Sequence, residues 1–155
     1  MMSYVTDKDL GWKRIVRKSN FINGKEIKAG VLASAGNEDN GKPIAQVASW
    51  NEYGTPSTPR RPWSVPARPF LAISTDENNG WKDESDKAFD KILGGAEVMS
   101  ALNNVGKKMQ KDIEKVIGDN SKLTPNKPST ILKKGHDLPL IDSGKLLDAI
   151  SFEVK

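Results

Sequence analysis

The most regular pattern of apolar positions lies between residues 97 and 117. Apolar side chains recur there every three or four residues, a spacing that places them on one face of an α-helix. Lysines occupy mostly other positions of this segment. We therefore expect a long helix that supplies much of the core and ends at Gly118; the alternative is a seam for a partner helix. The stripe consists of Val98, Leu102, Val105, Met109, Ile113 and Val116.

Three other segments show helical spacing over shorter lengths. Apolar residues between 10 and 16 suit a short amphipathic helix. The segment from 43 to 53 begins with a proline and is followed by Gly54, which are residues favoured in a first helical turn and after a last one. Residues 81 to 93 repeat the helical spacing until Gly94. Each of the three is predicted to be a helix.

Alternating apolar and polar residues predict strands at 27 to 33 and at 150 to 154. Residues 69 to 74 are expected to form a third strand. The predicted fold is α+β, with a small antiparallel sheet of these strands packed against the long helix and shorter helices around it. The polar segment from 119 to 138 is expected to be a long loop.

A short helix is expected just before the last strand. Asp142 or Ser143 can cap it, because either side chain can accept a hydrogen bond from a backbone N–H two or three residues further on.

Five of the nine prolines fall between Pro56 and Pro69. Each proline removes a backbone donor and fixes φ, so this segment cannot be an interior strand or a helix. We expect an extended, polyproline-like arm over residues 55 to 68 that contacts another protein. A plain loop is the simpler interpretation. The segment from Pro66 to Phe70 can also be a tight internal corner with Phe70 in the core. The side chain of Arg68 could pair with a carboxylate on the domain or on the next subunit.

Composition limits the remaining classes of protein. The 155 residues fit a single domain, 1 to 155. There are 24 Lys and Arg against 20 Asp and Glu, a charge of +4 that favours neither DNA nor a membrane as partner. The absence of cysteine excludes disulfides and thiolate metal sites. No apolar run approaches the roughly 20 residues that cross a bilayer, so we expect a soluble protein with no membrane partner.

Few residues suggest catalysis. A hydrolase would need the single histidine, His136, beside Ser143 and an aspartate, but the segment around Ser143 lacks the first glycine of the G-x-S-x-G elbow. One histidine without cysteine cannot build a zinc site, and no EF-hand spacing is present. A calcium or magnesium site of another kind is left as an alternative. The acidic residues near 76 and 83 are interpreted as solvated charges at helix starts. We expect no enzymatic activity and no cofactor.

Three segments resemble, in order, motifs of the neck and tail-completion proteins of long-tailed bacteriophages, a family also described as virion-morphogenesis or minor tail proteins. The first is Tyr53-Gly54-Thr55, after a short helix, and the second is the "PARPF" segment, Pro66 to Phe70. The third contains Ser129 to Ile131 with Lys134-Gly135 and then the block from Pro139 to Leu146. Serine stands at 143 where threonine is common, which keeps the hydroxyl.

The family-like region spans 26 to 155, whereas residues 1 to 25 match no motif. The segment from Pro56 to Ser64 is longer and richer in proline than in the family. The motif and expected subunit-contact residues are Tyr53, Gly54, Thr55, Arg60, Arg61, Trp63, Pro66, Arg68, Pro69, Phe70, Pro139, Leu140, Asp142, Ser143, Gly144 and Leu146.

The resemblance implies a structural subunit, without catalytic activity, that joins the capsid portal to the tail tube of a bacteriophage or prophage. Its partners would be copies of itself in a ring of about sixfold symmetry, together with other neck, connector or tail-tube proteins. DNA would meet it only by passage through the ring lumen. It would be made in the host cytoplasm and reside in the virion neck or tail. The alternative is a small basic nucleic-acid-binding protein that uses Arg60, Arg61, Trp63, Arg68 and the lysines at 107, 108, 111 and 115.

Overall fold

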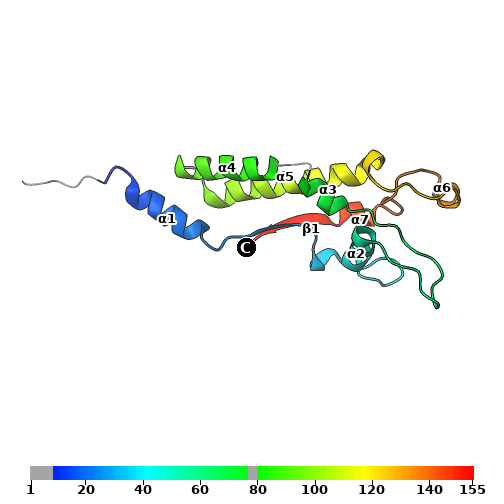
Figure 1. Ribbon diagram of the computed structural model, residues 1–155. Coiled ribbons are helices and arrows are strands. Elements are labelled where there is room, and N and C mark those ends of the chain that lie inside the picture. Colours follow the sequence, from blue (N-terminus) through cyan, green and yellow to red (C-terminus); the bar gives the residue numbers. More distant parts are fainter. Residues whose placement is uncertain (1–8, 77–79) are drawn as a thin grey trace, which may run out of the picture.

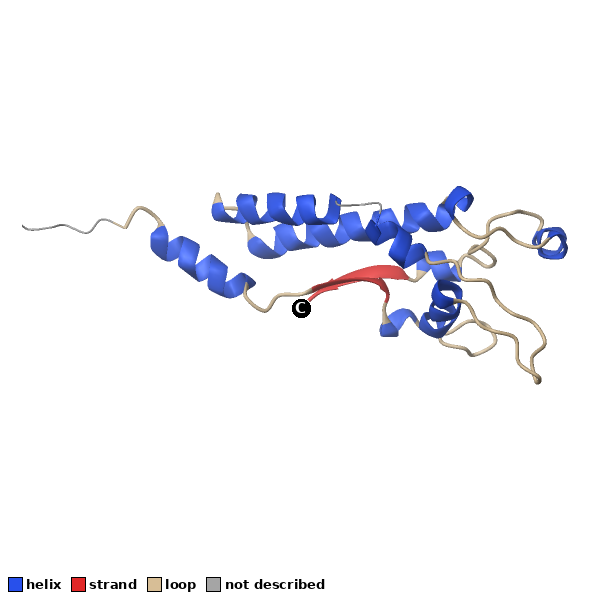
Figure 2. Cartoon of the chain, viewed as in Figure 1, coloured by secondary structure: helices blue, strands red, loops and turns tan. Residues whose placement is uncertain are grey.

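The computed structural model describes residues 9–76 and 80–155 and has the predicted α+β fold (Figures 1 and 2). These residues form seven α-helices and a two-stranded sheet in an elongated body. The elements are α1 (Trp12–Ile22), β1 (Ile27–Val31), α2 (Ile44–Tyr53), α3 (Phe70–Asp76), α4 (Gly80–Leu93), α5 (Val98–Gly118), α6 (Pro128–Lys134), α7 (Lys145–Asp148) and β2 (Ile150–Val154), with short 3-10 helices at Ala33–Ala35 and Asn120–Lys122.

The two predicted terminal strands pair with each other. β1 and β2 run antiparallel, with Ile27 opposite Val154 and Val31 opposite Ile150. Helix α5 lies along this sheet, and the ring of Phe152 packs directly on Gly106. The missing side chain at Gly106 therefore lets helix and sheet approach closely.

Helix α5 is the predicted long helix. Glu97 caps it, because its carboxylate accepts hydrogen bonds from the backbone N–H groups of Met99 and Ser100. The expected stripe faces the core: Val98, Val105, Ile113 and Val116 are buried, and Leu102 and Met109 are partly buried. At about 1.5–3 kcal/mol for each fully buried side chain, this helix is a principal source of hydrophobic stabilisation.

The core consists of two clusters of apolar residues. The smaller lies between α4 and α5 and includes Ile92 and Val105. The larger surrounds Phe70, Ile113 and Ile117, where α2, α3, α5 and α7 meet. This second cluster lies at the end of the body that carries the proline-rich segment.

The expected strand at residues 69 to 74 is wrong, because residues 70 to 76 form α3. The buried carboxylate of Glu52, on α2, accepts hydrogen bonds from the N–H groups of Leu71 at 2.9 Å and Ala72 at 3.0 Å. The first N–H groups of a helix have no partner inside it. A carboxylate placed on two of them stabilises a helix start, which the local pattern of residues did not reveal.

The expected loop from 119 to 138 is also partly wrong, since it contains α6. Pro128 occupies its first turn, and Gly135 follows its last with a left-handed φ of 77°. Both residues are common at helix boundaries as well as in loops, and here they delimit a helix. The first strand is shorter than predicted and ends at Val31.

The predicted N-terminal helix is present and longer than expected. None of the α1 side chains is buried. Its C-terminal half is held to the body by Lys18, whose ammonium donates to the carbonyl oxygens of Ile92 at 3.0 Å and Ala96 at 2.6 Å. Among the described helices, none is both long and apolar enough to cross a membrane.

Candidate interaction site at the base of the arm

The proline-rich segment leaves the end of α2 and projects from the body as a narrow hairpin (Figure 1). Thr55 and Val65 form a backbone pair at its base, with hydrogen bonds of 2.9 Å and 3.0 Å. Thr58 and Arg61 pair in the same way near the tip, at 2.8 Å and 2.9 Å. The arm therefore has two legs that support each other, where the sequence predicted one extended strap.

Most side chains of this hairpin face solvent. Trp63 is 61% exposed, Arg60 is exposed, and Tyr53 at the base is 80% exposed. Arg61 is partly held, because its guanidinium donates to the carbonyl oxygen of Pro56 at 2.8 Å. The arm thus presents an aromatic and basic surface while its backbone remains ordered by its own hydrogen bonds.

Arg68 turns inward and lies in the body. It is only 8% exposed, and its guanidinium donates to the carbonyl oxygens of Thr124 at 2.8 Å and Pro125 at 3.4 Å and to Oδ1 of Asn126 at 3.1 Å. Phe70 is fully buried. The segment from Pro66 to Phe70 is therefore an internal corner, and Arg68 does not belong to the exposed basic group.

Burial changes the pKa of two cations at this corner. It lowers the pKa of Arg68, and the negative charge of Asp137 opposes the change. Burial likewise lowers the pKa of Lys134, with Asp142 opposing it and Arg68 adding to it. The ammonium of Lys134 also donates to the carbonyl oxygen of Leu138 at 3.1 Å. Both cations thus lie in a partly desolvated, charge-compensated environment.

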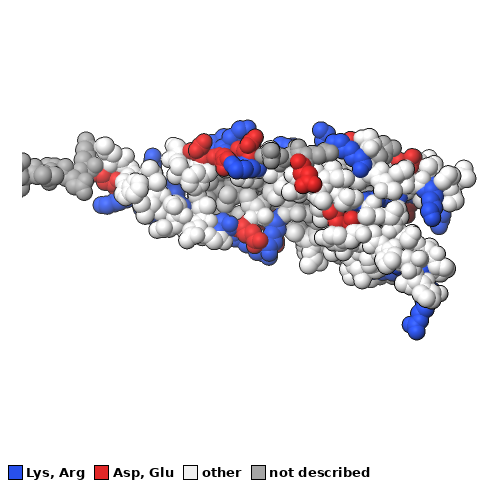
Figure 3. Space-filling model, viewed as in Figure 1, with Lys and Arg blue, Asp and Glu red and all other residues white. Residues whose placement is uncertain are grey.

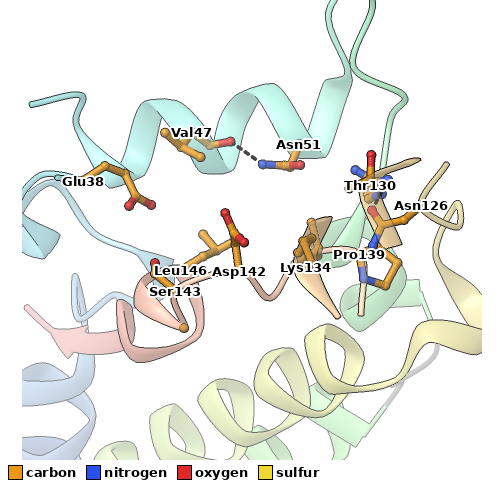
Figure 4. Close-up of a pocket in the computed structure, with 13 residues that line it drawn as sticks. Glu38, Val47, Asn51, Asn126, Thr130, Lys134, Pro139, Asp142, Ser143 and Leu146 are labelled. Atoms are coloured by element: carbon orange, nitrogen blue, oxygen red, sulfur yellow. Dashed lines mark hydrogen bonds between the residues drawn. The ribbon is translucent and has the colours of Figure 1, made fainter. Parts of the chain in front are cut away.

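A cavity of about 300 Å³ lies beside this corner (Figure 4). Its wall on α2 includes Val47 and Asn51, and the opposite wall comes from the block before α7. The cavity brings together motif residues that are distant in the sequence. These residues are Arg68, Pro139, Leu140, Asp142, Ser143, Gly144 and Leu146.

Asn126 gives this region an unsatisfied donor. Its Oδ1 must face Arg68, because a guanidinium carries only donors. That orientation leaves Nδ2 buried and, among the described residues, without a hydrogen-bond partner. Asn126 lines both this cavity and a neighbouring one beneath Val65 and Pro66. The base of the arm therefore has a fixed N–H donor that an acceptor oxygen can satisfy.

The same cavity bears on the hydrolase interpretation. Ser143 and Asp142 line it, but His136 is not among its lining residues. Nδ1 of His136 accepts a hydrogen bond from the backbone of Leu138 at 3.3 Å, and the Ser143 hydroxyl accepts one from the N–H of Lys145 at 3.4 Å. The serine thus contacts the first turn of α7, but the predicted cap by Asp142 or Ser143 is wrong, because Gly144 occupies the cap position and no described side chain caps the helix.

The basic residues of the nucleic-acid alternative do not form one continuous surface in the part of the chain that the structure describes. Arg68 is buried, and Lys108 pairs with Asp112 at 2.6 Å on α5. Figure 3 shows basic and acidic groups interspersed on the visible face, with basic atoms at the tip of the arm. Arg60, Arg61 and Trp63 are the members of that group that the arm presents together.

Three residues that build this region were not predicted from the sequence: Glu52, Asn51 and Asn126. The backbone carbonyl of Asn51 accepts the N–H of Arg68 at 2.6 Å, and Glu52 caps α3 through the amides of Leu71 and Ala72. Glu52 follows Ala48 by four residues, so a helical wheel places it on the buried side. A carboxylate at such a position signals a buried polar contact. No comparable local signal marks Asn126.

Comparisons of this chain with family models, curated proteins and solved structures gave no match. Among the described residues, no group of three acidic or histidine side chains is placed to hold a metal ion.

Proposed function

We propose that this chain is a structural subunit of a tailed bacteriophage or prophage that completes the head–tail junction or the end of the tail tube. The main support is the position of the three motif segments. The residues around Gly54 and the corner at Arg68 are far in the sequence from the block at Asp142, yet the three segments lie together at the base of one projecting arm.

The physical properties of the arm suit this role. In a ring of identical subunits, each subunit presents two different surfaces, one to each neighbour. A hairpin restricted by prolines loses less conformational entropy on docking than a flexible loop would. In this proposal the arm reaches a neighbouring subunit or another neck, connector or tail-tube protein, and DNA passes through the ring lumen.

A shortened arm tests the proposal. Because Thr55 and Val65 already exchange backbone hydrogen bonds, replacement of Pro56–Ser64 by Asn-Gly should close a two-residue hairpin on an intact base. We expect a folded protein with a melting temperature close to that of the unaltered chain. In the parent phage, we expect heads without attached tails.

A matched control variant distinguishes the effect of losing the arm from the effect of changing any exposed residue. Leu132→Ser alters a side chain that is 86% exposed on α6 and should leave virion assembly unchanged. The proposal would be wrong if the shortened arm gave complete virions at the normal yield. Electron microscopy of the purified protein, alone and with neck proteins, provides the direct test for rings.

The exposed Arg60 and Trp63 favour nucleic-acid binding as the second candidate function. Gel-shift titrations at two ionic strengths distinguish it, because binding through phosphate contacts weakens steeply with salt. Triple substitution of Arg60, Arg61 and Trp63 by alanine would abolish such binding. Under the structural proposal, the unaltered chain shows no salt-sensitive shift.

A further inference from the structure

We infer that α1 is a docking element that packs antiparallel against α4 of a second copy of this chain. The inference rests on the self-association in the proposed function, and it specifies the surfaces that meet. Its basis is the exposed faces of these two helices, and the arm plays no part in it.

The N-terminal half of α1 projects beyond the body (Figure 1). Trp12 is 70% exposed and Val16 is 37% exposed, and their spacing of four residues places them on one face. Lys13 and Arg17 form a second pair of the same spacing beside them. Among residues 9–76 and 80–155, it is these four that line a shallow hollow on the helix. The whole helix carries basic residues and no acidic one.

This overhang is held in position by the other end of the helix. Lys18 binds the carbonyl groups at the turn between α4 and α5, and Ile22 packs on the smaller core cluster. An apolar surface that the described residues of its own chain leave exposed indicates a contact site. The flanking cations indicate an occupant that is both apolar and acidic.

Helix α4 carries such a surface on its outer side. Phe89 is 45% exposed and Leu93 is partly exposed, again four residues apart. Asp86 and Asp90 form the adjacent pair, and both are exposed. Figure 3 shows acidic atoms over α4 with basic atoms among them. Asp86 already pairs with Lys82 at 2.7 Å, so Asp90 is the more available charge.

The two surfaces match in the arrangement of their side chains and in the sign of their charge. Each consists of an apolar pair beside a charged pair. Viewed from the N-terminus of its own helix, the charged pair follows the apolar pair in the same direction of rotation on α1 and on α4. When two such helices face each other in parallel, their charged pairs lie on opposite sides of the contact. When the helices run antiparallel, the charged pairs lie on the same side and can form ion pairs. That arrangement places Val16 against Phe89 and puts Asp90 between Lys13 and Arg17. Nε of Arg17 already donates to the carbonyl oxygen of Lys13 at 3.3 Å, so Lys13 is the freer partner for Asp90.

This contact has a consequence for assembly. The surface on α1 differs from the surface on α4, so each copy uses one of them toward each neighbour. Such a head-to-tail contact forms a ring when the rotation between copies closes, and an open filament when it does not. A single helix pair is small compared with a standard interface of about 800 Å² per partner, so we expect weak pairing until the ring closes.

Cysteine cross-linking tests the contact directly, because the chain has no cysteine of its own. We would prepare Val16→Cys and Phe89→Cys as separate chains, mix them in equal amounts and oxidise them gently. We expect mixed disulfide dimers well above the half share that random pairing gives. The inference would be overturned if the three disulfide dimers formed in the proportions of random pairing, or if the Val16→Cys homodimer predominated.

A charge exchange provides the second test. Lys13→Glu on the first chain, or Asp90→Lys on the second, should each lower the mixed yield about two- to fivefold, a range typical of an exposed ion pair. Both changes together should restore it. Arg14→Glu makes the same change on the opposite side of α1 and should have no effect. Failure of the double exchange to restore the yield would contradict the pairing of Lys13 with Asp90.

Two further outcomes would also overturn the inference. One is an internal disulfide in the monomeric chain that carries both cysteines, which would show that α1 folds back on its own α4. The other is co-sedimentation with phosphatidylglycerol vesicles that depends on Trp12, without mixed disulfides, which would assign α1 to an anionic membrane surface. Rings observed without mixed disulfides would refute this inference alone. Monomers under all conditions, alone and with neck proteins, would refute the proposed ring as well.

Discussion

Gly54 lies directly against Ala67 at the base of the arm. A Cβ at position 54 would lie 2.8 Å from the backbone nitrogen of Ala67 and 2.9 Å from the carbonyl oxygen of Val65. The φ of Gly54 is also left-handed, at 71°. The glycine of the Tyr-Gly-Thr motif is therefore the position where the outgoing and returning legs of the arm come together, and a side chain there would separate them.

We predict that Gly54→Ala destabilises the protein by about 2–4 kcal/mol, because it combines a left-handed backbone with a clash against main-chain atoms. Urea unfolding measures this loss. Gly36→Ala is the matched control, since Gly36 has a similar backbone conformation (φ 79° and ψ −156°, against φ 71° and ψ 175° at Gly54) and a Cβ added there would meet nothing within 4 Å. The control should lose only the cost of the strained backbone, about 1–3 kcal/mol, and less than Gly54→Ala. Equal losses in both variants would contradict the close contact with Ala67.

The contact between Gly106 and Phe152 leads to a second prediction. Alanine normally stabilises a helix interior relative to glycine by about 1 kcal/mol. At position 106, however, a Cβ would lie 2.7 Å from Cε2 of Phe152, on the strand that α5 covers. We expect Gly106→Ala to destabilise by about 1–3 kcal/mol through overpacking.

Gly118→Ala tests the same exchange at the end of α5, where nothing lies within 4 Å. It should be neutral or slightly stabilising. Thermal unfolding of the two variants provides the comparison, and a stabilised Gly106→Ala variant would show that helix and sheet are not in close contact.

The cap of α3 by Glu52 is the basis of a third prediction. Glu52→Gln removes the charge and leaves one of the two N–H groups, of Leu71 or Ala72, without its acceptor. We expect a loss of about 1.5–3 kcal/mol, as for a buried hydrogen bond to a charged group. Hydrogen exchange at these two amides should also become faster. Glu26→Gln, at a 63% exposed side chain, should change neither quantity appreciably.

The capping hydrogen bonds of Glu97 lead us to predict that the stability of the protein depends on pH. Hydrogen bonds from the backbone of Ser100 and Met99 lower its pKa in the folded protein. The folded state therefore binds this proton less readily than the unfolded state, and the contribution of Glu97 is complete above the unfolded pKa of about 4.3. It decreases as the pH falls through the folded pKa. Stability measured from pH 7 to 3 should fall more steeply in the unaltered chain than in Glu97→Gln; parallel curves would contradict the cap.

The sequence by itself determined the elements whose signals are local. The stripe from Val98 to Val116 predicted α5, because side chains three or four residues apart must share a helix face. Gly54 and Gly94 marked where α2 and α4 end. The alternation at 27 to 33 and 150 to 154 predicted the two strands that pair, since side chains two apart share a face of a sheet.

Only the tertiary structure decided the features that depend on distant residues. Residues 70 to 76 became a helix because a carboxylate from α2 binds its first N–H groups. Arg68 is not part of the exposed basic group, because carbonyl groups near residue 125 accept hydrogen bonds from its guanidinium. The meeting of Arg68 and the block around Asp142 at one cavity likewise depends on how the elements pack, as does the face of α1 that the described residues leave exposed. Local spacing fixes which way a side chain points from its own helix or strand, whereas packing fixes what lies opposite it.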